Sequence, residues 1–331
     1  MSTKIKLFIL LVFLLLAILL VRLSSKQSKI GVNKSLLSFP SGIKNVFVIV
    51  MENTNWSDIK GNTQSAPYIN SLLARSDASF ADQYYNPSRL HPSEPNYVWM
   101  EAGASTNLPN NTTTVSFTTD DDPSPSNSTS TKDHLVSLIN DSGNSWKTYQ
   151  EGIDGKVCPL NTNKITKYVP KHNPMIFFQD VTDNNSPNST YCIQHIRPFE
   201  ELATDLKKNS VVQYSFITPN NCDDMHDDKG CDTADQIKNG DVWLSKNLPV
   251  ILRSDSYRQD GVIFITWDEG KNRNDGPIGM MVLSSVAKGN GYHNALHYDH
   301  SSLLKTLIEI FNLKKYPGQS QSASDLGDLF R

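Results

Sequence analysis

The sequence lacks the charge pattern of a nucleic-acid-binding protein. Its 31 Lys and Arg residues stand against 34 Asp and Glu, and no basic stripe interleaved with aromatic residues occurs. We therefore expect no nucleic-acid partner. With 38% hydrophobic and 20% charged residues over 331 positions, the composition is that of an ordinary globular protein with a sizeable core.

Cysteine is scarce, and its spacing argues against a structural zinc site. The four cysteines are Cys158, Cys192, Cys222 and Cys231, and no two stand at the short C-x2-4-C spacing. An even number of cysteines is free to pair in an oxidising compartment. Of the three connectivities, we favour the pairing of neighbours, Cys158 with Cys192 and Cys222 with Cys231.

An unbroken apolar run, residues 7–21, lies close to the N-terminus. Lys4 and Lys6 precede it and Arg22 follows, the pattern of an export signal. The run is shorter than the roughly 20 residues that span a bilayer, yet it has no clear small-residue cleavage site. Residues 1–25 are thus a signal peptide or an N-terminal membrane anchor, 26–42 a linker, and 43–331 a single domain that is secreted or held outside the cytoplasm.

Three short apolar segments, residues 45–51, 211–217 and 261–267, have the β-branched character of buried strands. Amphipathic patterns typical of helices lie around them, at residues 67–75, 134–139, 198–208, 236–252 and 301–311. This alternation predicts an α/β fold, a three-layer α/β/α sandwich with a largely parallel central sheet. The polar stretches 112–131 and 180–190 are expected to be mobile surface excursions.

Acidic and amide residues follow two of the predicted strands. Glu52 and Asn53 come directly after the first strand, and Asp268 and Glu269 after the last. Ligands of parallel α/β sheets bind at the carboxyl ends of the strands. These four side chains are therefore expected to converge at one edge of the sheet.

Six short motifs occur along the chain, at residues 51–53, 66–70, 91–97, 218–227, 267–270 and 298–304. Together they resemble the phosphoesterase family of bacterial and fungal acid phosphatases and phospholipases C, within the alkaline-phosphatase-like superfold. The resemblance covers about residues 44–312. The form HPSEPNY at 91–97 is more similar to the acid phosphatase branch than to the phospholipase branch. Trp99 and Met100 depart from the smaller residues that relatives tend to carry there.

The resemblance implies a role for each matching residue. Ser93 would be the nucleophile and also a metal ligand. The other metal ligands would be Glu52, Asn53, Asp268 and Glu269. The residues that serve phosphate would be His91, His226 and His300. A serine hydroxyl is a weak nucleophile that a bound cation can activate, here toward a phosphoseryl intermediate. An all-oxygen ligand set suits one hard divalent ion, Mg2+, Ca2+ or Mn2+, with Zn2+ still open.

The same residue types favour activity in mild acid. Carboxylates, with reference pKa values of about 4, remain ionised there, whereas histidines with pKa values near 6.5 become donors to phosphate or to a leaving group. His226 is the first candidate for that role. The remaining histidines without a motif, His134, His172, His195 and His293, are assigned structural or solvated positions. The segment 297–300 hints at a second metal ion but lacks a full ligand set.

The predicted function is that of an extracytoplasmic acid phosphatase acting on phosphorylated small molecules or phosphoinositide head groups. A phospholipase C-type phosphodiesterase, a binding protein on an inactive scaffold, and a sulfatase-like or phosphotransferase enzyme are the alternatives. Each motif alone also has a plain structural interpretation. Ser93 in particular would then only cap a helix, and Glu52 and Asn53 would only begin a loop.

Overall fold

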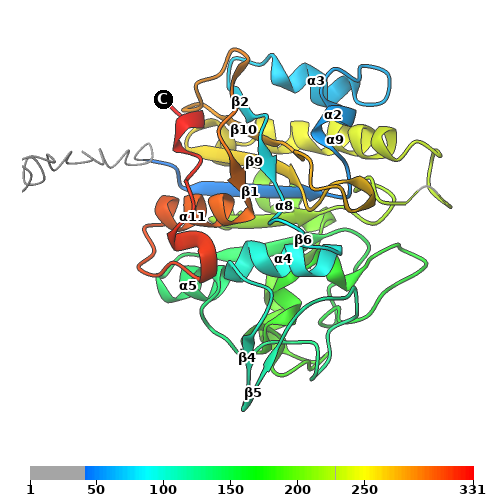
Figure 1. The fold of residues 1–331 in the computed structure, drawn as a ribbon, viewed down its shortest axis with the longest axis vertical. Coiled ribbons are helices and arrows are strands. Elements are labelled where there is room, and N and C mark those ends of the chain that lie inside the picture. The colour runs from blue at the N-terminus through cyan, green and yellow to red at the C-terminus, as the bar shows by residue number, and fades with distance from the viewer. Residues whose placement is uncertain (1–41, 228) are drawn as a thin grey trace, which may run out of the picture. The chain divides into compact units, whose positions relative to one another are not determined.

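The computed structural model describes residues 42–227 and 229–331, which lie in one compact unit, Phe39–Arg331 (Figure 1). The predicted export segment and nearly all of the predicted linker fall outside these described residues. Among the helices of the described part, none has the length and apolar character needed to cross a membrane.

An eight-stranded sheet forms the centre of this unit, in the order β11, β2, β10, β9, β1, β8, β6, β7. Its strands are β1 (Asn45–Met51), β2 (Ala78–Ala81), β6 (Trp146–Gln150), β7 (Ile196–Pro198), β8 (Tyr214–Thr218), β9 (Gly261–Trp267), β10 (Met280–Ser284) and β11 (Tyr292–Asn294). Two small sheets pair β3 (Tyr84–Tyr85) with β12 (Tyr298–Asp299), and β4 (Leu108–Asn110) with β5 (Thr113–Val115).

The sheet is mostly parallel, as predicted. Strands β9, β1, β8, β6 and β7 run in parallel, and only β10 lies antiparallel to its neighbours β9 and β2. Both β1 and β9 have the bounds predicted from sequence, because a continuous apolar run identifies a strand buried on both faces. The third predicted strand begins later than expected, at Tyr214.

Helices surround the sheet, and each of the five predicted ones forms with bounds shifted by a few residues at most. The five predicted helices are α3 (Pro67–Leu73), α5 (Leu135–Asp141), α8 (Glu200–Lys207), α9 (Gln236–Arg253) and α11 (His300–Ile310). The structure adds α2 (Trp56–Ile59), α4 (Ser93–Ala102), α6 (Gln179–Thr182), α7 (Thr190–His195) and α10 (Asp255–Arg258). Short 3-10 helices are η1 (Pro170–His172), η2 (Pro174–Phe177), η3 (Lys271–Arg273), η4 (Gly318–Gln321) and η5 (Gly327–Leu329).

Two groups of helices cover opposite faces of the sheet, which gives the predicted three layers. Phe216 of β8 packs against Tyr97 of α4, with ring centroids 6.3 Å apart. Met51 of β1 points to the other face, where a Cβ on Gly240 of α9 would come within 2.8 Å of it. Val48 of β1 is the register partner of Phe216, so both face the side of the sheet that α4 covers. Met51 is three positions from Val48, and because successive strand residues alternate between the two sides, Met51 and α9 lie on the opposite side.

The two polar stretches are less peripheral than predicted. Within 180–190, helix α6 ends at Thr182, and Val181, Thr182 and Ser189 are buried, so these positions anchor the segment. Residues 183–188 between them are exposed or half-buried, as expected of a surface excursion. Within 112–131, strand β5 forms and Phe117 is buried. Apolar and hydroxyl side chains scattered among the polar residues anchor both segments to the domain.

Candidate active site

The centre of the site lies where β1 and β9 end side by side. Met51 and Trp267 are partners in the parallel register, so Glu52 and Asp268 follow at the same edge of the sheet. The backbone N–H of Asn53 donates a 3.0 Å hydrogen bond to Asp268 Oδ1. Both carboxyl groups are fully buried. The predicted convergence of these residues is therefore present in the structure.

Ser93 joins this pair from the first residue of helix α4. Its hydroxyl is buried and donates to Glu52 Oε2 at 3.0 Å, with Asn53 Oδ1 at 3.4 Å. The cap position of α4 belongs to Pro92, not to Ser93. The hydroxyl therefore points at the carboxylate cluster instead of capping the helix.

Oxygen acceptors crowd together around Ser93. Asn53 Oδ1 faces Glu52 Oε2 and Asp268 Oδ1, and only a reversed amide would donate to them, at 2.7 Å and 3.1 Å. Asp268 Oδ2 is buried without a hydrogen bond. Burial, followed by the charges of Asp268 and Asp224, raises the pKa of Glu52 well above its ordinary value, and burial raises the pKa of Asp268 to about 7.

This donor set fits a hard cation. Within residues 42–227 and 229–331, no group of three His, Cys, Asp or Glu side chains is arranged to hold a metal ion. A cation would depend instead on the mixed set of the Glu52 and Asp268 carboxylates, the Asn53 amide oxygen and the Ser93 hydroxyl. Acceptors that face one another without a hydrogen between them are unfavourable unless a positive charge lies among them.

Glu269 turns away from this cluster. Its Oε2 atom lies 2.5 Å from His91 Nδ1 and accepts from the Asn96 side chain at 3.2 Å. The other ring nitrogen of His91 lies 3.0 Å from Asp275 Oδ1. Burial raises the pKa of Glu269 to about 9. Glu269 thus orients His91 in this structure, and its role as a metal ligand stays a prediction.

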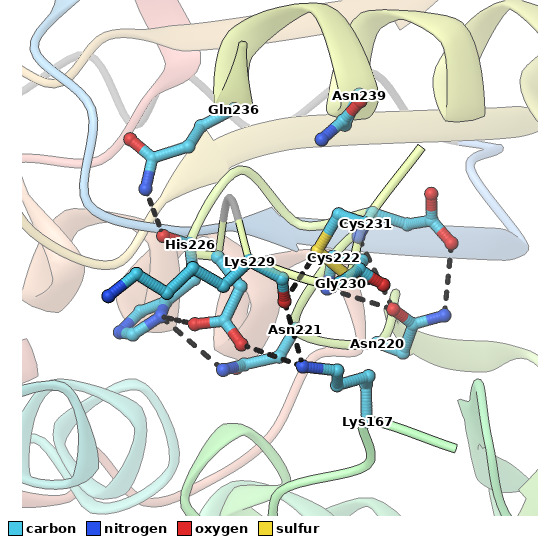
Figure 2. The surroundings of a disulfide bond; sticks show 12 residues. Lys167, Asn220, Asn221, Cys222, His226, Lys229, Gly230, Cys231, Gln236 and Asn239 are labelled. Carbon is cyan, nitrogen blue, oxygen red and sulfur yellow. Dashed lines mark hydrogen bonds and ion pairs between the residues drawn. A yellow bond between two sulfur atoms is a disulfide. The ribbon is translucent and has the colours of Figure 1, made fainter. Parts of the chain in front are cut away.

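His226 lies on a loop that a disulfide closes (Figure 2). Its Nδ1 atom is 2.9 Å from Asp227 Oδ1, and the Asn221 side chain approaches at 3.3 Å. Gln236 donates to its backbone carbonyl. The side chain is 27% exposed, and burial lowers its pKa below the ordinary histidine value. A neutral ring held through one nitrogen leaves the other nitrogen available to a substrate.

Both predicted disulfides form. Cys158 pairs with Cys192 and Cys222 with Cys231, with Cα atoms 5.4 Å and 5.3 Å apart. The second bond spans nine positions and encloses His226.

His300 is held by contacts on both of its ring nitrogens. It is fully buried, with Nε2 at 2.6 Å from the backbone oxygen of Asp268 and Nδ1 at 3.1 Å from the Tyr84 hydroxyl. Burial lowers the pKa of His300 to about 4. Because both ring nitrogens are engaged, His300 positions the end of β9 in this structure, and its predicted role toward phosphate stays a prediction.

The neighbouring segment 297–299 is occupied by structural contacts. Asp299 caps helix α11 by accepting from the backbone N–H groups of Ser301 and Ser302. The ring of His297 lies 4.8 Å from that of Tyr85. These contacts give no support to a second metal ion there.

Sequence reasoning missed His172 and Asp224, which lie on the far side of Glu52. His172 Nε2 is 3.2 Å from Glu52 Oε1, and its Nδ1 is 3.0 Å from Asp224 Oδ2. Burial lowers the pKa of His172 well below its ordinary value. Asp224 belonged to a recognised motif, but His172 stands in the short helix η1 with no motif around it. Only the fold brings His172 to the site.

Lys171 and Asp120 were also missed. Lys171 Nζ lies 2.9 Å from Asp120 Oδ2, and Asp120 Oδ1 accepts from the backbone N–H of Glu94, next to Ser93. A lone lysine before a histidine and an aspartate in a polar stretch give no signal in the sequence.

Two other histidines without a motif, His134 and His195, make structural contacts. His134 is buried between Glu101, at 3.3 Å, and Asp180, at 3.1 Å. The ring of His195 stacks on Trp146, with centroids 4.5 Å apart.

A mostly parallel sheet with a buried serine and carboxylates at its carboxyl edge makes this an α/β protein, and its structural neighbours give it an alkaline-phosphatase-like fold. The fold matches a protein of the alkaline phosphatase superfamily from Vibrio parahaemolyticus with a TM-score of 0.53 at 9% identity, over 84% of this chain and 69% of that one. The model of the Phosphoesterase family matches residues 64–314, and the chain belongs to that family.

Two curated relatives extend this result. A probable acid phosphatase of Kluyveromyces lactis is 27% identical over 278 residues, 81% of this chain and 58% of the relative. A phosphatidylinositol-3-phosphatase of Mycobacterium tuberculosis is 26% identical over 288 residues, 86% of this chain and 82% of the relative. This chain thus spans somewhat more than half the length of the first relative.

Proposed function

We propose that this protein is an extracytoplasmic acid phosphatase that hydrolyses phosphate monoesters with Ser93 as the nucleophile. The observation that carries the proposal is the buried Ser93 hydroxyl, which donates to Glu52 Oε2 at 3.0 Å beside Asn53 and Asp268. A hydroxyl oriented on a carboxylate is the arrangement expected of an activated serine.

One divalent cation would be held by Glu52, Asn53, Asp268 and the hydroxyl of Ser93. It would supply the positive charge that keeps the carboxylates ionised and lowers the pKa of the serine hydroxyl. Oxygen donors favour Mg2+, Ca2+ or Mn2+, and Zn2+ is a further candidate for the test.

The chain's own residues account for the remaining steps. Ser93 Oγ attacks phosphorus while its proton passes to Glu52 Oε2 along their hydrogen bond, and the bond between phosphorus and the ester oxygen breaks to give the phosphoseryl intermediate. Water then hydrolyses this intermediate, which releases inorganic phosphate and restores the hydroxyl of Ser93. His226, held by Asp227, donates a proton to the leaving alkoxide through its other ring nitrogen. Since burial lowers the pKa of His226, its protonated form appears only in acid, which accounts for an acid optimum.

The relatives support monoester substrates of two kinds. The name of the Kluyveromyces lactis protein points to general acid phosphatase activity, and that of the Mycobacterium tuberculosis protein to phosphorylated inositol lipids. The substrate proposed here is therefore a terminal phosphate on a small molecule or a phosphoinositide head group. The two disulfides support a location outside the cytoplasm.

The test is hydrolysis of a chromogenic phosphomonoester by the full chain from pH 4 to 9, after chelation and with each of the four cations restored. Ser93→Ala should abolish the activity. Ser215→Ala, which removes a buried hydroxyl from β8, is the control and should retain it. Equal activity of wild type and Ser93→Ala would contradict the mechanism. Activity on phospholipid diesters alone would favour the phospholipase C-type alternative, and inactivity on both would favour an inactive scaffold.

A further inference from the structure

Lys171 is a mostly buried cation at the edge of the site. Its side chain is 15% exposed, and its Nζ atom lies 2.9 Å from Asp120 Oδ2. The next residue, His172, reaches Glu52 Oε1 at 3.2 Å. Lys171 thus enters the site on the same short helix, η1, as a residue that touches the carboxylate beside the nucleophile.

Asp120 connects this lysine to the nucleophile's helix. While Oδ2 holds Lys171, Oδ1 accepts from the backbone N–H of Glu94 at 3.0 Å. Glu94 directly follows Ser93 in the first turn of α4. One carboxylate therefore fixes the lysine relative to the hydroxyl that attacks phosphorus.

The charge of Lys171 acts on the whole acidic cluster. It lowers the pKa values of Glu52, Asp224 and Asp268, although burial raises each of them more strongly. A phosphate dianion that enters this site meets several carboxyl groups and needs a positive charge beside them. An ammonium group has three N–H donors, and one bond to Asp120 leaves two of them for oxygen atoms of a ligand.

We propose that Lys171, held in place by Asp120, binds the phosphate group of the substrate and of the released product. This role rests on the proposed phosphatase function and adds the residue that determines affinity for phosphate. The alternative is a structural ion pair that only joins the loop at Asp120 to η1. A structural pair would affect thermal stability and leave phosphate affinity unchanged, so binding measurements separate the two.

The test is the affinity of the full chain for inorganic phosphate, measured by calorimetry and as competitive inhibition of monoester hydrolysis. Lys171→Met should weaken phosphate binding and raise KM by about tenfold or more, the scale of one charge-assisted hydrogen bond, with a smaller change in kcat. Lys171→Arg should recover part of the affinity. Asp120→Asn, which keeps an acceptor for Glu94, should give an intermediate loss.

Lys147→Met is the matched control. Lys147 pairs with Asp205 at 2.7 Å and is similarly buried, at 23% exposure, but it lies in β6 and pairs with α8. This control should leave phosphate affinity unchanged.

The outcomes distinguish the inference from the function on which it rests. Wild-type hydrolysis with unchanged KM and phosphate affinity in Lys171→Met would overturn the role of Lys171 and leave the phosphatase intact. Phosphate binding that depends on Lys171 without hydrolysis would support the role and remove the proposed activity. If Lys171→Met fails to fold, unchanged affinity in both Lys171→Arg and Asp120→Asn overturns the inference, and a graded loss in the two supports it.

Discussion

Ser93 Oγ and Glu52 Oε2 form a 3.0 Å hydrogen bond across 41 positions of the sequence. Ser93 begins α4, and Glu52 follows the last residue of β1. The length of this hydrogen bond therefore depends on how α4 packs against the carboxyl edge of the sheet. Anything that shifts α4 along β1 should reduce catalysis before it unfolds the domain.

Glu52→Gln tests the cation site without relying on turnover. The neutral amide removes repulsion among buried carboxyls, so this variant should be at least as stable as wild type in chelator. Added divalent cation should stabilise wild type, by about 2.7 kcal/mol at 100 times Kd, and should stabilise Glu52→Gln much less. Thermal unfolding with and without the cation measures this. In the control Glu151→Gln, which changes a half-buried carboxyl whose pKa is raised to about 7, the stabilisation by added cation should persist.

His226→Gln should lower kcat by about 100-fold for alkyl phosphates, because no acid then protonates the leaving oxygen. For a nitrophenyl phosphate, whose leaving group needs no proton, the loss should be much smaller. Comparison of the two substrates across pH 4 to 9 provides the measurement, with His195→Gln as a control that changes a histidine outside the site. An equal loss on both substrates would contradict a role in protonating the leaving group.

His134 gives stability a dependence on pH that is independent of catalysis. Burial lowers the pKa of His134, but the hydrogen bonds that its ring donates to the Asp180 and Glu101 carboxylates outweigh burial and raise the pKa from 6.5 to about 9. The charged ring therefore contributes stability, about 3 kcal/mol, fully below pH 6.5, and this contribution is lost as the pH rises through 9. Denaturant unfolding of wild type and His134→Gln should differ most near pH 6 and converge near pH 10. A constant difference would show that only packing is lost.

Removal of each of the two disulfides should affect stability and activity to different extents. By loop entropy, loss of Cys158–Cys192, 34 positions apart, should cost about 4 kcal/mol, and loss of Cys222–Cys231, nine apart, nearer 3 kcal/mol. The shorter bond closes the loop that carries His226, so the double Cys→Ser variant at 222 and 231 should lose more kcat. Chemical denaturation and kinetics on both double variants test this. Greater loss of activity at 158 and 192 would contradict it.

Much of the fold could be predicted because its signals are local. Continuous apolar runs gave β1 and β9 with their correct bounds. The strand at 214 was placed too early because Val211 and Val212 extend its apolar pattern beyond the backbone pairing. The composition of 180–190 is mostly polar and predicts a surface segment, but a few buried side chains within it anchor it to the domain.

Part of the site could also be predicted from local signals, and part of it could not. Glu52, Asn53, Ser93 and Asp268 follow strand ends or begin a helix within recognisable motifs, and the structure brings them together. Glu269 and His300 stand in equally clear motifs, yet one turns to His91 and the other to the backbone of Asp268. A motif identifies which residue is present, but the packing around it determines where the side chain points.

The sequence by itself determined the α/β class and which residues, Ser93, Glu52, Asn53 and Asp268, form the candidate site, because hydrophobic period and motif spacing are properties of short segments. It favoured the pairing of neighbouring cysteines, and the structure confirmed that pairing. The tertiary structure decided that Lys171, His172 and Asp120 belong beside Ser93. Those residues come from irregular segments, and their proximity follows only from how η1 and the loop at Asp120 pack against α4. The charged and hydrogen-bonding contacts around Ser93 join segments that are far apart in the sequence, so no pattern within one short segment predicts them.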